Sequence, residues 1–218
     1  MIRVVVVGTD TDVGKTWVTA QIIRELRSDG HQVAARKLVQ SRDLADDPAG
    51  DDRSLLAVAS GEQPSTVCPD HLIFDLPLAP PMAAEILGQE IPELRDLLDV
   101  VPWDAQTDVV FFETAGGLRS PQASDADSLD VTAWLDPHVV ILVAPDVLGV
   151  ISQVRLCVDA LRNRLDGVPV IVALNARDKT GTEGRNGNWL RDRDEFVVLE
   201  SPTAISEIAG ALARQIEA

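Results

Sequence analysis

Residues 8–16 read GTDTDVGKT and follow directly on a mostly apolar run at residues 2–7. Beyond them, apolar residues recur at helical spacing over residues 17–28. A buried strand, a turn that contains glycines and a helix that opens at a Lys-Thr pair are typical of a phosphate-binding loop, because backbone N–H groups and the helix N-terminus then face the anion. In such a loop Lys15 would reach the β- and γ-phosphates of a nucleotide, and the Thr16 hydroxyl would bind Mg²⁺.

The spacing of the glycines departs from the general pattern of such loops. Five residues separate Gly8 from Gly14, one more than in that pattern, and Thr9 stands where the pattern has glycine. The alternative is an ordinary strand–turn–helix corner with a surface lysine. Because the flanking strand, the helix and the Lys-Thr pair all match the context that phosphate binding requires, we interpret the stretch as a variant phosphate-binding loop.

Composition limits the class of protein. The chain has 218 residues and a formal net charge of −16, which suits one α/β domain over residues 1–218 and argues against a nucleic-acid or anionic-membrane partner. Cys68 and Cys157 are the only two cysteines and lack metal-ligand spacing, so we expect reduced thiols. Since the sequence has no signal-peptide pattern and no apolar run long enough to cross a bilayer, we expect a cytoplasmic protein.

Runs of Val, Ile, Leu and Phe without polar alternation predict parallel strands that are covered on both faces. Helical patterns lie between them, and two of these open with proline, which suits a first helical turn. The alternation over the whole length predicts a doubly wound, mostly parallel α/β sheet in a single domain. The predicted strands are 2–7, 32–37, 108–113, 138–144, 168–174 and 196–199, and the predicted helices are 17–28, 54–60, 80–87, 92–100, 151–164 and 205–216.

Two stretches are predicted to be loops. Residues 41–52 are acidic, contain Pro48 and Gly50, and follow the carboxyl end of a strand, where ligands bind in sheets of this kind. Residues 176–188 are rich in Lys, Arg, Gly, Thr and Asn, and we interpret most of them as a solvated connection.

Two strand ends carry groups suited to phosphoryl transfer, in which hard oxygens hold the metal and cations hold the phosphate. One predicted strand ends at Lys37, and another ends at Glu113 before a glycine-containing segment. A glutamate there is a natural Mg²⁺ ligand, because a carboxylate is rarely buried without a partner. The alternatives are a carboxylate that caps the following turn, for Glu113, and a lysine that reaches solvent, for Lys37. Asp51 and Asp52 offer a further carboxylate, and the sequence leaves open which of them binds the metal.

The phosphate loop, including its extra residue, resembles the ATP loop of the dethiobiotin synthetase family, whose members usually carry Glu where this chain has Asp12. The resemblance continues in order over nearly the full length, through 37–41 (KLVQS), 76–80 (LPLAP), 113–118 (ETAGGL) and 174–175 (LN). It implies a sheet of the P-loop nucleoside triphosphate hydrolase type. It also implies a ligase of biotin biosynthesis that uses ATP and Mg²⁺ to form dethiobiotin from 7,8-diaminononanoate and CO₂.

The reaction of that family proceeds through a carbamate. One amine takes up CO₂, the carbamate attacks the γ-phosphate to give a carbamic–phosphoric anhydride, and the second amine then displaces phosphate. By resemblance, Lys15 and Lys37 stabilise the phosphoryl and carbamate charge, while Thr11 and Ser41 hydrogen-bond the carbamate. The physical contributions are positioning and charge neutralisation, with no covalent enzyme intermediate.

The resemblance also implies the nucleotide and metal contacts. Thr16, Asp52 and Glu113 would hold Mg²⁺, and Asn175 would contact the adenine edge. Similar enzymes are homodimers with the substrate's carboxylate tail near the subunit interface, so a homodimer is implied here. The remaining nucleotide contacts are implied for Asp12, Val13, Gly14, Lys15, Thr16 and Trp17.

Four features depart from the family pattern, and all lie in the substrate half. The family has Lys-Pro-Val followed by Ser/Thr-Gly at the second strand, where this chain has Leu38 for the proline and Arg42 for the glycine. Thr114 replaces the first glycine of Glu-Gly-Ala-Gly-Gly, and residues 119–130 are unusually acidic for a segment near a substrate carboxylate. We therefore expect the nucleotide and metal half to be kept and the substrate half to be altered.

The alternatives to a dethiobiotin synthetase come from several classes. A diverged paralogue would apply the same ATP chemistry to another amine or carboxylate. A nucleotide-binding regulatory or partitioning module usually has a second lysine early in the loop, where this chain has residues 9–11 (TDT), which argues against that class. A non-catalytic binding protein is the remaining alternative. Turnover of ATP that depends on diaminononanoate and bicarbonate separates them.

Overall fold

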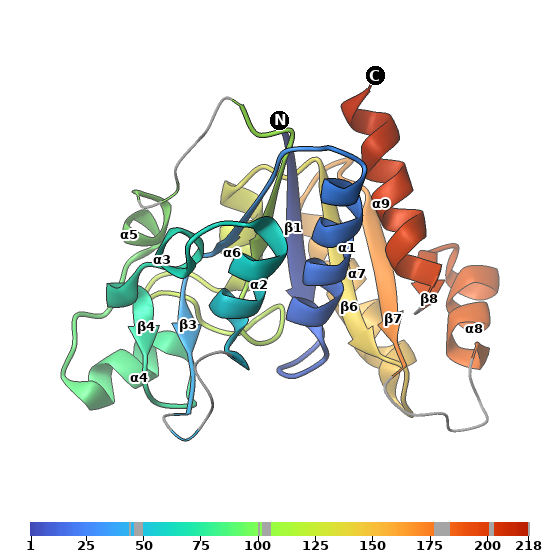
Figure 1. Ribbon diagram of the computed structural model, residues 1–218. Coiled ribbons are helices and arrows are strands. Elements are labelled where there is room, and N and C mark those ends of the chain that lie inside the picture. The colour runs from blue at the N-terminus through green and yellow to red at the C-terminus, as the bar shows by residue number, and fades with distance from the viewer. Residues whose placement is uncertain are drawn as a thin grey trace.

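Six parallel strands form the central sheet, in the order β2-β5-β1-β6-β7-β8 (Figure 1). The computed structural model describes residues 1–43, 45, 50–99, 101, 106–176, 184–200 and 203–217. The predicted strands are confirmed, with small shifts at their ends. They are β1 (Ile2–Gly8), β2 (Val33–Lys37), β5 (Val109–Glu113), β6 (Val139–Pro145), β7 (Val170–Asn175) and β8 (Val197–Glu200).

The strands are apolar throughout because both faces of the sheet are covered. In β1, Val4 and Val6 pack into one core, Val5 and Val7 pack into the other, and all four side chains are fully buried. The first core contains side chains of α1, α2 and α9, and the second contains side chains of α6 and α7. Figure 1 shows α1, α2 and α9 in front of the sheet, with α6 and α7 behind it.

The main predicted helices are confirmed as well. α5 begins at Leu94 rather than at Pro92, and Val100 lies outside the described residues. The helices that correspond to predicted ones are α1 (Lys15–Ser28), α2 (Asp52–Ser60), α4 (Pro80–Leu87), α5 (Leu94–Asp99), α7 (Val150–Arg164) and α9 (Thr203–Ile216).

The two predicted loops need correction at their ends. Ser41 belongs to a short strand and Asp52 opens α2, so the loop 41–52 is shorter than predicted, and its residues 44 and 46–49 lie outside the described part. The loop 176–188 is wrong from Arg185 onward, where a polar helix begins, and its residues 177–183 are not described. The elements not predicted are β3 (Gln40–Ser41), β4 (Ile73–Phe74), α3 (Pro64–Val67), a 3-10 helix (Asp70–Leu72), α6 (Ser128–Trp134) and α8 (Arg185–Asp194).

The strand order places the carboxyl ends of β2, β5 and β1 side by side. The chain leaves β1 for β2 on one side of the sheet and later passes from β5 to β6 on the other, so the direction of winding changes at β1. Lys37 of β2 pairs in register with Glu113 of β5, and Glu113 pairs with Val6 of β1. Ligands of open α/β sheets bind in the crevice at such a switch point. In Figure 1 these strand ends meet at the lower edge, beside the loop that leads into α1.

The described part of the chain has no membrane-spanning helix, and its two cysteines are free thiols. None of its helices combines the length and the apolarity that a bilayer span requires. Cys68 and Cys157 are free thiols, and burial raises the pKa of Cys68 to about 12. The Cys68 thiol is therefore protonated at neutral pH and a poor nucleophile.

Candidate active site

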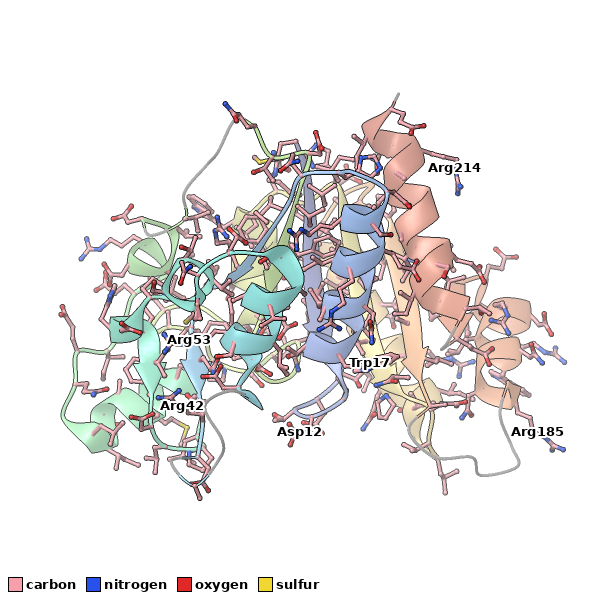
Figure 2. All side chains as sticks on the ribbon, viewed as in Figure 1. Asp12, Trp17, Arg42, Arg53, Arg185 and Arg214 are labelled. Atoms are coloured by element: carbon pink, nitrogen blue, oxygen red, sulfur yellow. The ribbon has the colours of Figure 1, made fainter. Side chains whose placement is uncertain are left out.

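The loop between β1 and α1 requires both of its glycines. Gly14 has a φ of 96°, in the left-handed region that favours glycine. A Cβ atom at Gly8 would lie 2.8 Å from the Asp10 carbonyl oxygen and 2.9 Å from the Lys15 ammonium. The loop therefore closes tightly around the lysine, and Figure 2 shows Asp12 at its tip.

Lys15 is a buried cation that faces the interior of this loop. Its ammonium donates a hydrogen bond to the Asp10 carbonyl oxygen at 3.0 Å. Burial, with the Lys37 charge as the next cause, lowers the pKa of Lys15 to about 8. Because the hydrogen-bond acceptor is a neutral carbonyl, the charge of Lys15 is available to neutralise a phosphate group.

Oxygen atoms from three elements converge beside the start of α1. The Thr16 hydroxyl lies 2.7 Å from an oxygen of Asp52 and 2.7 Å from an oxygen of Glu113. The Thr19 hydroxyl, which was not predicted, lies 3.0 Å from the other oxygen of Glu113. Thr19 lies on the same face of the helix as Thr16, three residues further on, and this spacing was the available signal.

Lys37 joins the two carboxylates. Its ammonium forms ion pairs with Asp52 and, at 2.9 Å, with Glu113. Desolvation alone would lower the pKa of Lys37, but the two carboxylates outweigh it and raise that pKa. Desolvation alone would raise the pKa of Asp52, but the Lys37 ammonium outweighs it and lowers that pKa. Lys37 is only 2% exposed, so the alternative of a lysine that reaches solvent is wrong.

Asp51 and Asp52, the two candidate metal ligands between which the sequence did not decide, have different environments. Asp52 lies beside Thr16, whereas Asp51 accepts a hydrogen bond from the Ser54 backbone N–H at 2.8 Å and caps α2. No cluster of three or more His, Cys, Asp or Glu residues gathers as a metal site in the described part of the chain. Two carboxylates and a hydroxyl nonetheless fit Mg²⁺, which takes few protein ligands when phosphate oxygens and water complete its octahedron.

A cavity of about 550 Å³ opens over the loop and brings most predicted ligand contacts together. Within the described residues, its lining does not include Val13, Glu113 or Asn175. The Asn175 amide instead donates to the Val13 carbonyl oxygen at 3.1 Å, which ties the end of β7 to the loop. The lining is formed by Thr11, Asp12, Gly14, Lys15, Thr16, Trp17, Lys37, Ser41, Arg42, Asp52, Leu55, Pro77, Leu78, Ala79, Pro80, Ala115, Gly116 and Ser120.

Some of these residues were not predicted. Leu55 lies on α2 and Ser120 follows the glycine segment after β5, and neither belongs to a motif that indicates a role. Residues 77–80 were part of the quoted resemblance, but no function was predicted for them. Their position in the cavity wall depends on the pairing of the two short strands β3 and β4.

The departures from the family pattern differ in what they contact. Of the three substituted positions, all within the described residues, Leu38 is buried in the core and Arg42 lines the cavity, while Thr114 is not among the lining residues. The Thr114 hydroxyl is buried without a hydrogen-bond partner among the described residues. The acidic residues between 119 and 130 have local partners: Asp127 and Asp130 form the capping box that begins α6.

A glycine loop at the switch point of a parallel sheet, with its Lys-Thr pair beside carboxylates from α2 and β5, places the chain among the P-loop nucleoside triphosphatases by fold. Solved structures are similar at the level of the fold. The signal recognition particle receptor FtsY from Elizabethkingia anophelis in complex with GDP aligns with a TM-score of 0.50 and 19% identity, over 90% of this chain and 55% of that chain. The signal recognition particle 54 kDa protein from Aeropyrum pernix K1 in complex with GDP aligns with a TM-score of 0.50 and 15% identity, over 99% of this chain and 49% of that chain. The chain thus spans about half the length of these two solved chains.

Sequence comparison identifies the family. A family model described as an AAA domain matches residues 3–209. Proteins named ATP-dependent dethiobiotin synthetase BioD are similar over most of the chain. The protein of Phenylobacterium zucineum is 37% identical over 82% of this chain and 78% of the relative, and that of Rhodopseudomonas palustris is 41% identical over 77% and 72%. The protein of Haloferax mediterranei is 34% identical over 90% and 82%. The chain belongs to the dethiobiotin synthetase family.

Proposed function

We propose that the protein is an ATP-dependent dethiobiotin synthetase, which converts 7,8-diaminononanoate, CO₂ and ATP into dethiobiotin, ADP and phosphate. The observation that carries the proposal is the convergence of Lys15, Lys37, Thr16 and Asp52 on one cavity, with Glu113 directly behind them. Two cations and two carboxylates at one point suit a phosphoryl transfer, in which catalysis depends on positioning and on neutralising charge. The identity of the substrate is inferred from membership of the family.

The carbamate is assigned to the part of the cavity between Thr11 and Ser41. Both residues line the cavity that also contains the two lysines. The Ser41 hydroxyl is buried and has no hydrogen-bond partner among the described residues, so it is available as a donor. An unsatisfied buried hydroxyl is costly, and a bound carbamate would supply the missing acceptor.

Two displacements complete the proposed reaction. A carbamate oxygen attacks the γ-phosphorus and ADP leaves, while Lys15 and Lys37 neutralise the charge on the transferring group. The second amine then attacks the carbonyl carbon of the anhydride, phosphate leaves, and the amine loses a proton as the cyclic urea closes. Neither step needs an enzyme nucleophile, because the carbamate and the amine are the nucleophiles.

Thr16, Asp52 and Glu113 are the proposed ligands of Mg²⁺. A Mg²⁺ ion held by these residues would neutralise negative charge on the phosphate groups of the nucleotide. The nucleotide contacts are assigned to the loop and the start of α1, at residues 12–17. Asn175 remains the proposed adenine contact because the family resemblance implies it, and its amide also donates to the Val13 carbonyl oxygen of the loop.

We infer a cytoplasmic homodimer with small-molecule substrates and no nucleic-acid partner. The proposed reaction consumes ATP, which supports the cytoplasm, and the net charge of −16 disfavours nucleic acid. The dimer is supported by apolar side chains that are exposed in the single chain. Val147, Leu148 and Leu156, at the β6–α7 connection and on α7, are 50%, 103% and 68% exposed.

Complementation tests the proposed function. A biotin auxotroph that lacks this step should grow without biotin when it carries the wild-type chain, and should not grow with Lys15→Ala. Growth on added dethiobiotin in every strain is the control. A wild-type chain that binds ATP but does not restore growth would favour the paralogue, because Arg42 and Thr114 alter the substrate half.

A further inference from the structure

Arg42 links two parts of the cavity wall. It directly follows β3 and lines the cavity, and its backbone N–H donates to the Phe74 carbonyl oxygen at 3.0 Å. Its guanidinium forms one ion pair with Asp75 at 2.8 Å and another with Asp51 at 2.8 Å. The hydrogen bond to Asp75 is the main cause that raises the pKa of Arg42. Figure 2 shows Arg42 near the end of β3, below Arg53.

Asp51 connects Arg42 to the metal side of the cavity. One Asp51 oxygen accepts from the Ser54 backbone N–H and caps α2, while the other accepts from Arg42. The next residue, Asp52, carries the carboxylate beside Thr16. Arg42 therefore contacts the cap of the helix that presents a proposed metal ligand.

Asp75 connects Arg42 to the apolar side of the cavity. It begins the segment 75–80, whose residues 77–80 line the cavity and lead into α4. The other side chains of this segment are apolar, so its side-chain ion pair within the described residues is the one between Asp75 and Arg42. Leu78 of this segment and Leu55 of α2 are 39% and 37% exposed at the cavity.

We propose that Arg42 is a positioning residue that holds the segment 75–80 against the N-terminus of α2 and thereby sets the width of the apolar side of the cavity, where the hydrocarbon chain of the substrate lies. The proposal rests on the proposed function for the identity of that substrate. Arginine suits the role because its planar fork binds two carboxylates in a fixed geometry, which a lysine does not. A misplacement of about 1 Å at a reacting centre costs on the order of 100-fold in rate.

A double-mutant cycle tests the link between Arg42 and Asp75. Arg42→Met removes both ion pairs but keeps an unbranched side chain, and Asp75→Asn removes one of them. Each should raise KM for diaminononanoate by about 10-fold, the size of a typical coupling between contacting residues, and leave KM for ATP unchanged. The double variant should be no worse than Arg42→Met, because Asp75 then has no partner left to lose. Additive effects, or equal increases in both KM values, would overturn the proposal.

Asp70→Asn is the matched control. It removes the ion pair between Asp70 and Arg53, which lies at 2.5 Å beside the same helix but outside the cavity lining, and it keeps Arg42, Asp75 and the 3.8 Å ion pair of Arg53 with Asp51. Both KM values should stay at the wild-type level. A loss of folded protein would lower kcat in any variant and leave KM unchanged. A raised KM for diaminononanoate therefore distinguishes a displaced segment 75–80 from a loss of folded protein.

Hydrogen–deuterium exchange gives a readout that does not depend on activity. In Arg42→Met and Asp75→Asn, the backbone amides of residues 76, 78 and 79 should exchange faster, while those of the loop 8–16 should not change. Unchanged exchange at residues 76–79 would contradict the positioning role whatever the activity. A wild-type protein that makes no dethiobiotin would contradict the proposed function, and the exchange result would still decide the role of Arg42.

Discussion

Lys15 is the proposed phosphate-binding residue, and we expect its protonation to affect nucleotide binding most directly. Its pKa is lowered to about 8, first by burial and then by the Lys37 charge. A phosphate group favours the charged ammonium, so the complex holds this proton to a higher pH than the free protein does. Between the two pKa values the complex binds more protons, and affinity therefore falls as pH rises.

We predict that ATP affinity begins to fall about one unit below pH 8 and falls above pH 8 by up to about 10-fold per pH unit. Titration calorimetry at several pH values measures this directly. Lys15→Arg, whose guanidinium does not lose its proton in this range, should show weaker binding without the step near pH 8. A step of equal size in Lys15→Arg would assign the titration to another group.

Glu113 should affect turnover more than binding. Glu113→Gln keeps the shape of the side chain but removes the charge that faces Thr16 and Lys37. We expect ATP affinity without Mg²⁺ to stay near the wild-type value, while Mg²⁺-dependent turnover falls roughly 100-fold, the loss typical of an electrostatic group at a reacting centre. Steady-state kinetics over a range of Mg²⁺ concentrations, with ADP release as the readout, is the measurement. Turnover within twofold of wild type would exclude Glu113 from the metal site.

At the scale of elements, the segment after β5 is held by two buried side chains, Gln122 and Ser128, of which Gln122 binds both backbone groups of Ala115. Gln122 is 2% exposed, accepts a hydrogen bond from the Ala115 N–H at 2.9 Å and donates one to the Ala115 carbonyl oxygen at 2.8 Å. Gly117, two residues on, packs so tightly on the phosphate loop that a Cβ atom there would lie 3.1 Å from the Thr9 carbonyl oxygen. Gln122 thus fixes a segment that borders both the loop and the cavity.

Gln122→Leu should destabilise the protein by about 1–3 kcal/mol, because it leaves the Ala115 N–H without its partner and the Ala115 carbonyl oxygen with only the Ser128 hydroxyl at 3.3 Å. Chemical denaturation gives the free energy of unfolding, and Gln153→Leu, at an exposed glutamine of α7, should change it by less than about 0.5 kcal/mol. If both variants unfold alike, the two hydrogen bonds of Gln122 contribute nothing to stability.

The elements that could be predicted are those with a long apolar pattern. β1 and β6 are nearly continuous Val, Ile and Leu runs, and their type and place follow from that. β3 and β4 have two residues each, which is too short for any period. α8 is mostly polar, so the signal of an amphipathic helix is missing, and α6 lies in an acidic stretch where Asp127 and Asp130 are helix caps.

The candidate site was predictable to the extent that it lies on strand ends. Lys37 and Glu113 end neighbouring parallel strands, and the loop after β1 completes the group, so strand order alone brings them together. The partners of Arg42 could not be predicted in this way. They depend on the pairing of β3 with β4 and on the start of α2, which the sequence pattern does not specify.

At the scale of the whole molecule, we predict a dimer. Sedimentation velocity at micromolar concentration should give about twice the chain mass of 23.5 kDa. Leu148→Asp, at the most exposed of the apolar residues near α7, should shift the protein toward the monomer. Val58→Asp on α2, which is 74% exposed, is the control and should leave the mass unchanged. If the wild-type protein is a monomer, a subunit interface cannot form part of the substrate site.

We propose above all that the lysines and carboxylates beside the phosphate loop catalyse a ring closure that consumes ATP. The direct test is to incubate the purified wild-type protein with ATP, Mg²⁺, bicarbonate and diaminononanoate, and to quantify ADP and dethiobiotin by mass spectrometry. We predict equal amounts of the two products, with neither formed by Lys15→Ala and no ADP release when diaminononanoate is omitted. ADP without dethiobiotin, or ADP formation that does not depend on the diamine, would contradict the claim.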